Sequence, residues 1–157
     1  MTEDWFDLLA AFTAADVRYL VVGAHALAVH GVPRGTQDLD VWVEPVPDNA
    51  ERAWRALAAF GAPLDSLGVS LDDLHRHDTV VQLGLPPERI DILTTITGVP
   101  DFATAWADRV EHVVRGLPVP FLGRATLLRN KRATGRRKDL ADIEALGEDP
   151  DAPPADR

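Results

Sequence analysis

The chain has 157 residues, of which 46% are hydrophobic and 26% charged, which is enough globular polypeptide for one hydrophobic core. It contains no cysteine, so disulfide frameworks, thiolate zinc sites and cysteine nucleophiles are excluded. The 16 Lys and Arg residues are outnumbered by 25 Asp and Glu residues, and the resulting charge of −9 argues against a protein that coats nucleic acid over its whole surface.

The basic residues are concentrated in one segment, from His112 to Lys138, which contains no acidic residue. This segment holds half of the basic residues and both lysines, Lys131 and Lys138. The rest of the chain is strongly acidic. A basic segment beside an acidic body suggests an anion site facing a cation site, and the alternative is an ordinary solvated helix face.

In the first half of the chain, hydrophobic patterning predicts alternating helices and strands. An amphipathic helix is expected over 2–15, because apolar residues recur there at helical spacing: Trp5, Leu8, Leu9 and Phe12. A continuous apolar run at 19–22 ends at Gly23 and predicts a buried strand. The expected elements that follow are a short helix at 24–30, a strand at 38–43 and a helix from Asp48 or Asn49 to Phe60.

The second half is expected to begin with a loop over 61–78 that contains a short helix. The further expected elements are strands at 79–85 and 89–95, a helix at 101–109, short edge strands at 110–114 and 118–122, and helices at 125–134 and 138–146. Residues 148–157 contain three prolines, four acids and no large apolar side chain, so we expect one domain over 1–147 and a disordered tail over 148–157. The acidic start and the lack of an 18-residue apolar run predict a cytoplasmic protein without signal peptide or membrane span.

Two expected strands carry isolated acids within apolar runs. Asp38 and Asp40 point to the same face, because side chains alternate along a strand. Asp91 lies in the apolar run from Ile90 to Leu93, and if the two strands are neighbours it completes a cluster of three carboxylates. Burial of unpaired carboxylates is costly, so such a cluster favours one or two Mg²⁺ ions, which prefer oxygen ligands. Two metal ions can neutralise a triphosphate, and Gly23 at a strand-to-helix junction allows close approach of a phosphate.

These motifs resemble the polymerase-β-like nucleotidyltransferase superfamily. The resemblance rests on Gly23-Ala24, on Asp38-Leu39-Asp40-Val41 and on Ile90-Asp91-Ile92. Within that superfamily, the stretch from Val22 to Asp40, together with Asn130-Lys131-Arg132-Ala133 and Arg137-Lys138-Asp139-Leu140-Ala141-Asp142, is similar to small bacterial nucleotidyltransferases related to the AbiEii toxins of toxin–antitoxin systems. The match covers 19–146. It implies an α/β (α+β) nucleotidyltransferase fold, with a mixed β-sheet flanked by helices and with C-terminal helices.

The resemblance also implies roles for individual residues. Asp38, Asp40 and Asp91 would bind Mg²⁺, with Asp91 assisting general-base chemistry, and Lys131 would reach the triphosphate as a mobile point charge. The other residues implied in nucleotide binding are Gly23, Ala24, Arg34, Thr36, Lys138, Asp139 and Asp142. Asp139 or Asp142 would hold the lysine and arginines in place or contact the nucleotide. The family commonly has a glycine or serine where this chain has Ala24; a serine hydroxyl can hydrogen-bond a phosphate and alanine cannot, although the backbone amide is retained.

Three functions follow as hypotheses. The first is a Mg²⁺-dependent nucleotidyltransferase that transfers NMP from an NTP, with ATP among the candidates, to an acceptor such as tRNA or a protein, in the manner of a toxin with a cognate antitoxin. The second is a non-catalytic binding or regulatory module with the same fold, which Ala24 and the short chain favour. The third is a small-molecule nucleotidyltransferase that modifies an antibiotic. The basic segment would face RNA in the first case, and the sequence leaves the oligomeric state open.

Overall fold

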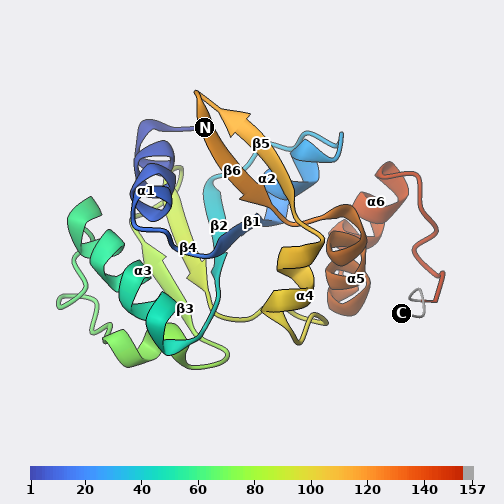
Figure 1. The fold of residues 1–157 in the computed structure, drawn as a ribbon. Coiled ribbons are helices and arrows are strands. Elements are labelled where there is room, and N and C mark those ends of the chain that lie inside the picture. The colour runs from blue at the N-terminus through green and yellow to red at the C-terminus, as the bar shows by residue number, and fades with distance from the viewer. Residues whose placement is uncertain (154–157) are drawn as a thin grey trace.

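The structure is a computed structural model, and it describes residues 1–153. Its centre is a mixed sheet of six strands in the order β3-β4-β2-β1-β6-β5 (Figure 1). The strands are β1 (Tyr19–Val22), β2 (Asp38–Val43), β3 (Val80–Leu83), β4 (Arg89–Leu93), β5 (Val110–Val114) and β6 (Leu117–Phe121). Strand β2 pairs with β4 in parallel and with β1 in antiparallel orientation, and β1 pairs with β6 in parallel. The predicted mixed sheet and α/β class are confirmed.

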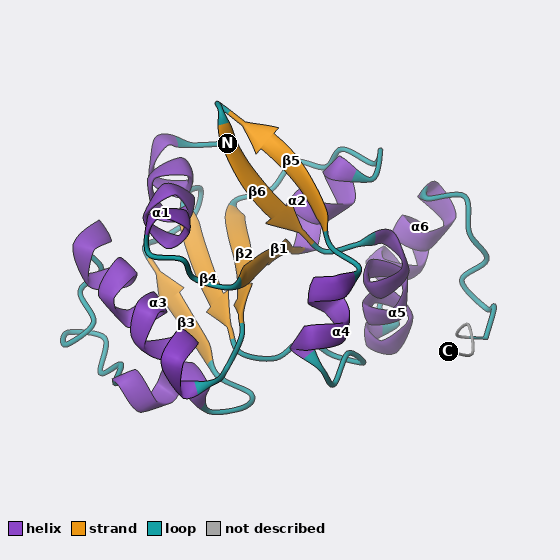
Figure 2. Cartoon of the chain, in the orientation of Figure 1, coloured by secondary structure: helices purple, strands orange, loops and turns teal. Residues whose placement is uncertain are grey.

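The helices are arranged in separate groups around this sheet. They are α1 (Glu3–Ala14), α2 (Gly23–Val29), α3 (Pro47–Phe60), the 3₁₀ helix η1 (Leu71–His75), α4 (Phe102–Ala107), α5 (Arg124–Thr134) and α6 (Arg137–Ala145). Helices α1 and α3 pack against each other, and so do α5 and α6, which lie on the other side of the view from α1 and α3 (Figure 2). The C-terminal helix pair is therefore a distinct layer beside the sheet.

The hydrophobic core forms between the strands and the apolar faces of the helices. In α1 the four residues at helical spacing are all buried: Trp5, Leu8, Leu9 and Phe12. The Thr2 hydroxyl caps this helix by accepting a hydrogen bond from the Trp5 N–H at 3.2 Å. Trp42 is fully buried in β2, and its indole N–H donates to the Thr94 carbonyl. Trp42 shares the face of Asp38 and Asp40 by strand alternation, but it belongs to the core.

Two details differ from the sequence-based expectations. The strand predicted at 118–122 as an edge strand is internal, because β6 lies between β1 and β5, and only β5 is an edge on that side. Helix α3 begins at Pro47 rather than at a cap formed by Asp48 or Asn49. The Asn49 side chain is instead buried, where it accepts from the Arg18 N–H and donates to the carbonyls of Arg18 and Glu44.

The tail predicted at 148–157 lies partly outside the described residues. Within the described part, Glu148 and Asp149 contact α5: Arg124 donates to the Glu148 carboxylate, and Arg132 donates to the Asp149 carbonyl. Residues 154–157 are outside the described range. None of the helices in 1–153 is both long enough and apolar enough to cross a membrane.

Candidate functional site

The parallel pairing of β2 and β4 gathers three carboxylates at one place. In this register Asp38 is opposite Arg89, and Asp40 is opposite Asp91. The two strands that carry the aspartates are therefore neighbours, which is the condition on which the predicted cluster of three carboxylates depends. One ligand oxygen from each of Asp38, Asp40 and Asp91 lies within 4.8 Å of the other two. Asp91 is buried, and Asp38 and Asp40 are half-buried. We call these three residues the carboxylate triad.

Gly23 packs directly against the triad from the start of α2. Its φ is +67°, and a Cβ atom added at this position would lie 2.3 Å from Oδ2 of Asp40. An L-amino acid with a side chain is disfavoured at this φ, and its Cβ would also occupy the space of the Asp40 carboxylate. The glycine at the strand-to-helix junction is thus required by Asp40. Ala24 follows as the second residue of α2 and is half-buried.

Arg89 holds two members of the triad together. Its Nη2 donates to Oδ2 of Asp38 at 2.9 Å and to Oδ2 of Asp91 at 3.2 Å. Its Nε forms an ion pair with Oδ1 of Asp91 at 3.1 Å, without the angle of a hydrogen bond. The nearby Asp91 and Asp38 carboxylates raise the pKa of the Arg89 guanidinium, so it stays fully charged. Arg89 was not among the residues predicted from the sequence.

Thr36 orients the first carboxylate of the triad. Its hydroxyl lies 2.9 Å from Oδ1 of Asp38 and 2.9 Å from the Asp38 carbonyl oxygen, and the Asp38 N–H lies 3.3 Å from the same hydroxyl. Thr36 therefore closes the loop that leads into β2. Its predicted contact with a nucleotide stays a prediction.

The electrostatic environment of the triad favours a proton on Asp40. The pKa of Asp40 is raised to about 7, mainly by burial and also by the negative charges of Asp38 and Asp91, while Arg89 opposes the shift. Three carboxylates this close cannot all remain ionised at low energetic cost with one guanidinium as counter-ion. The triad thus carries an excess of negative charge that a proton or a divalent cation can relieve.

The residues present fit a divalent metal ion. All three donors are carboxylate oxygens, the ligand type that Mg²⁺ prefers. Oδ1 of Asp91 is buried and makes no hydrogen bond, which is a costly arrangement for an acceptor. Within 1–153 its one charged contact is the Arg89 ion pair, so a cation at the triad would give this oxygen a direct ligand bond and would replace the proton on Asp40. The lack of a side chain at Gly23 leaves the Asp40 carboxylate its space.

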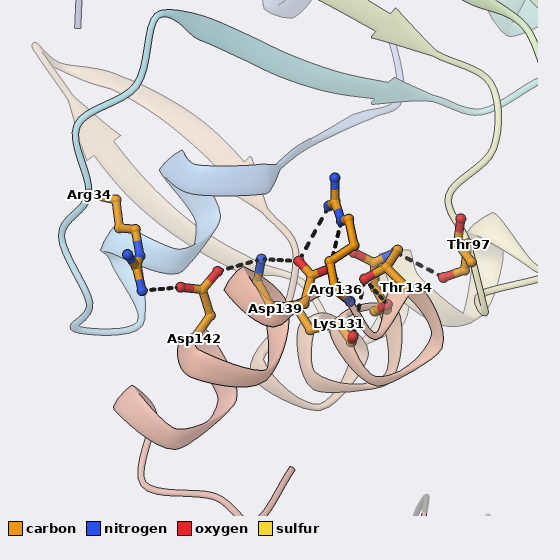
Figure 3. Close-up of polar contacts among 8 residues, drawn as sticks. Arg34, Thr97, Lys131, Thr134, Arg136, Asp139 and Asp142 are labelled. Atoms are coloured by element: carbon orange, nitrogen blue, oxygen red, sulfur yellow. Dashed lines mark hydrogen bonds and ion pairs between the residues drawn. The ribbon is translucent and has the colours of Figure 1, made fainter.

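A second polar cluster joins α5 to α6. Nζ of Lys131 lies 3.0 Å from Oδ2 of Asp142 and 3.5 Å from Oδ1 of Asp139 (Figure 3). Nε of Arg136 donates to Oδ2 of Asp139 at 2.7 Å. Lys131, Asp139 and Asp142 are all buried, and Lys131 is only 8% exposed. Lys131 is thus held between two aspartates rather than extended as a mobile charge, and its action on a triphosphate stays a prediction.

Arg34 links this second cluster to the loop that precedes β2. Its guanidinium pairs with Oδ1 of Asp142, so the loop between α2 and β2 is anchored on α6 (Figure 3). The same loop carries Thr36 and leads directly to Asp38. The Lys131 cluster therefore braces the segment that presents the triad. Lys138, in contrast, is exposed, and no ion pair of its side chain occurs within 1–153.

Sequence reasoning missed two basic residues with clear partners. Arg89 lies two positions before Asp91, so both side chains point to the same face of β4, and this spacing is a signal that could have identified it. Arg136 precedes α6, and its own N–H and its Nε both donate to Asp139, three residues later. That spacing is typical of a helix start.

Comparison with solved structures shows the fold of the chain. A protein from Thermotoga maritima assigned provisionally as a nucleotidyltransferase has a TM-score of 0.58 at 15% identity, with 91% of this chain and 88% of that chain covered. The lincosamide antibiotic adenylyltransferase LnuA, solved with lincomycin bound, has a TM-score of 0.59 at 16% identity, with 94% and 97% covered. An antigenic nucleotidyltransferase-like protein from Paracoccidioides brasiliensis has a TM-score of 0.51 at 18% identity, with 91% and 72% covered.

No family model and no curated protein matches the sequence. The structural likeness is extensive, because it covers more than nine tenths of this chain in each case. At these low identities it establishes architecture alone. The chain has the nucleotidyltransferase fold, with the carboxylate triad on two adjacent strands of its sheet.

Proposed function

We propose that this protein is a Mg²⁺-dependent nucleotidyltransferase, which transfers a nucleoside monophosphate from an NTP to an acceptor. The observation that carries this proposal is the carboxylate triad, formed by the register of β2 and β4 in a nucleotidyltransferase fold. A structural neighbour, LnuA, is an adenylyltransferase, which supports the same reaction class. We place the activity in residues 1–147 and the protein in the cytoplasm, where NTPs are available.

Each residue has a separate part in this proposal. Asp38, Asp40 and Asp91 hold the metal. When bound, one or two Mg²⁺ ions neutralise the triphosphate and lower the barrier to in-line displacement. The acceptor oxygen attacks the α-phosphorus, pyrophosphate leaves, and Asp91 assists removal of the acceptor proton. Gly23, with no side chain, lets the phosphates approach the backbone beside Asp40, and Lys131 contributes positive charge from α5.

The class of acceptor has two candidates, each with its own supporting observation. Exposed basic residues on α5 and α6, namely Arg129, Arg137 and Lys138, favour an RNA acceptor such as tRNA. This would suit a toxin of the AbiEii type with a cognate antitoxin, as the sequence motifs suggest. The match to LnuA along 97% of that enzyme favours a small molecule such as an antibiotic. A non-catalytic module of the same fold is the remaining alternative.

Incubation with the four α-³²P-labelled NTPs and Mg²⁺ tests the proposal. Total tRNA, cell protein, aminoglycosides and lincosamides would be offered as acceptors in parallel. We expect label on one acceptor class with release of pyrophosphate, and no label with the double variant Asp38→Asn, Asp40→Asn. The matched control is Asp7→Asn, Asp65→Asn, which removes two exposed acids elsewhere. Failure to label any acceptor, together with stable co-purification of a partner protein, would instead favour the non-catalytic module.

A further inference from the structure

The side chain of Arg89 supplies a positive charge directly beside the carboxylate triad. The Arg89 guanidinium contacts Oδ2 of Asp38 and both oxygens of Asp91. Among the ion pairs and hydrogen bonds within 1–153, it is the only basic side chain that bonds to the triad. It therefore occupies oxygens of Asp38 and Asp91 that a metal ion at the triad would need.

A guanidinium and a divalent ion compete for the same lone pairs. Arginine keeps its charge at all accessible pH values, so Arg89 cannot yield its place by losing a proton. Its charge also repels an incoming cation at the distance of a direct contact. Metal entry thus requires the guanidinium to move away. The Arg89 side chain is 30% exposed and begins β4, beside an exposed turn at 84–88, so it has access to solvent.

A triphosphate offers this guanidinium another partner. Arginine binds phosphate oxygens through paired N–H groups, as it binds carboxylates. We propose that Arg89 is a tethered counter-ion that opposes divalent cation binding at the triad until a triphosphate draws it away, so that metal and nucleotide bind together. This inference rests on the proposed function, because it assumes that the triad is a metal site that takes an NTP.

The first test measures Mn²⁺ binding without nucleotide by isothermal titration calorimetry. We expect Arg89→Gln to bind Mn²⁺ at least tenfold more tightly than the wild type. The matched control is Arg55→Gln, which removes one positive charge from an exposed pair with Glu51 on α3 and should bind Mn²⁺ like the wild type. Circular dichroism establishes that each variant is folded.

The second test uses the Mg²⁺ complex of the α,β-methylene analogue of ATP, which cannot be cleaved at the bond that transfer would break. Here Arg89→Gln should lose its advantage and bind no more tightly than the wild type, because the phosphates then lack their arginine partner. A gain for Mn²⁺ without a gain for the nucleotide complex is a pattern that loss of packing alone does not produce.

The outcomes separate this inference from the proposed function. If the wild type and Arg89→Gln bind Mn²⁺ with equal affinity, the counter-ion role is overturned while the metal site stands. If Arg89→Gln binds no Mn²⁺ without nucleotide, the counter-ion role is overturned, and if neither protein binds the metal complex of the nucleotide analogue either, both proposals fail. If Arg89→Gln gains equally for Mn²⁺ and for the nucleotide complex, the coupling to nucleotide is overturned. Should Arg89→Gln not fold, Arg89→Lys decides: lysine lacks the fork that spans Asp38 and Asp91, so Mn²⁺ affinity should rise at least threefold, and unchanged affinity would overturn the inference.

Discussion

Replacing Gly23 with alanine should disrupt the carboxylate triad through a single added methyl group. Gly23 has φ +67°, and its added Cβ would lie 2.3 Å from Oδ2 of Asp40 and 3.2 Å from Cγ of Asp40. Ordinary van der Waals contact begins near 3.4 Å, so the carboxylate must move by about 1 Å. Gly68 provides a matched control, because it has φ +68° but no atom within 4 Å of an added Cβ.

The two substitutions share one energetic cost and differ in another. Both force alanine into the left-handed region, which costs about 1–2 kcal/mol. Only Gly23→Ala also drives Asp40 from its rotamer, which adds about 0.5–1.5 kcal/mol. A shift of Asp40 also separates it from Asp38 and Asp91. We therefore expect Gly23→Ala to lose about 2–3 kcal/mol of stability and most of its metal affinity, and Gly68→Ala to lose stability alone.

Urea denaturation gives the free energy of unfolding of each variant, and calorimetric Mn²⁺ titration gives the metal affinity. Gly68→Ala should bind Mn²⁺ like the wild type. The reasoning is refuted if the two variants lose equal stability and Gly23→Ala retains wild-type Mn²⁺ affinity. That result would mean that Asp40 adapts to the extra methyl group without leaving the triad.

Three further predictions follow from the charged groups. Because the pKa of Asp40 is raised to about 7 in the folded protein, the folded state holds a proton that the unfolded state has lost. The free energy of unfolding without metal should therefore fall by about 1–2 kcal/mol from pH 5.5 to pH 8.5. Urea denaturation at both pH values measures this decline, and Asp40→Asn should abolish the part due to this proton. Mn²⁺ binding must expel the same proton, so wild-type Mn²⁺ affinity should rise by up to about tenfold per pH unit below pH 7 and then level off, whereas a flat calorimetric profile would contradict a shared proton. Lys131→Met leaves the buried carboxylates of Asp139 and Asp142 without their shared ammonium, so the free energy of unfolding measured in urea should fall by about 3 kcal/mol. The exposed control Lys138→Met should lose less than about 0.5 kcal/mol. Equal losses in the two variants would refute the buried network.

The triad could be predicted from the sequence because it depends on local patterns. Two aspartates at spacing two within an apolar strand must share a face, and one further isolated aspartate in another apolar strand is the natural third member. The structure supplies the pairing of β2 with β4, which places Asp40 opposite Asp91. The helix α1 is predictable for the same reason, because four apolar residues at helical spacing fix its buried face.

The spacings of Arg89 from Asp91 and of Arg136 from Asp139 are local, but the other features that sequence reasoning missed depend on pairing between distant segments. The role of Arg89 requires the register that sets it opposite Asp38, and no local pattern contains that register. Similarly, β6 is internal because it pairs with β1, nearly a hundred residues earlier in the chain. The burial of Lys131 depends on how α5 packs on α6, although the spacing of Asp139 and Asp142 already places both acids on one helix face.

The central claim is that the carboxylate triad binds a divalent metal together with a nucleotide. A crystal structure grown with Mn²⁺ and the α,β-methylene analogue of ATP, with anomalous scattering measured for manganese, tests it most directly. We predict an anomalous peak in contact with Asp38, Asp40 and Asp91, phosphate density beside it, and the Arg89 side chain turned away from Asp38. Arg89 still bonded to Asp38 and Asp91, with no anomalous peak at millimolar Mn²⁺ and nucleotide, would contradict the claim.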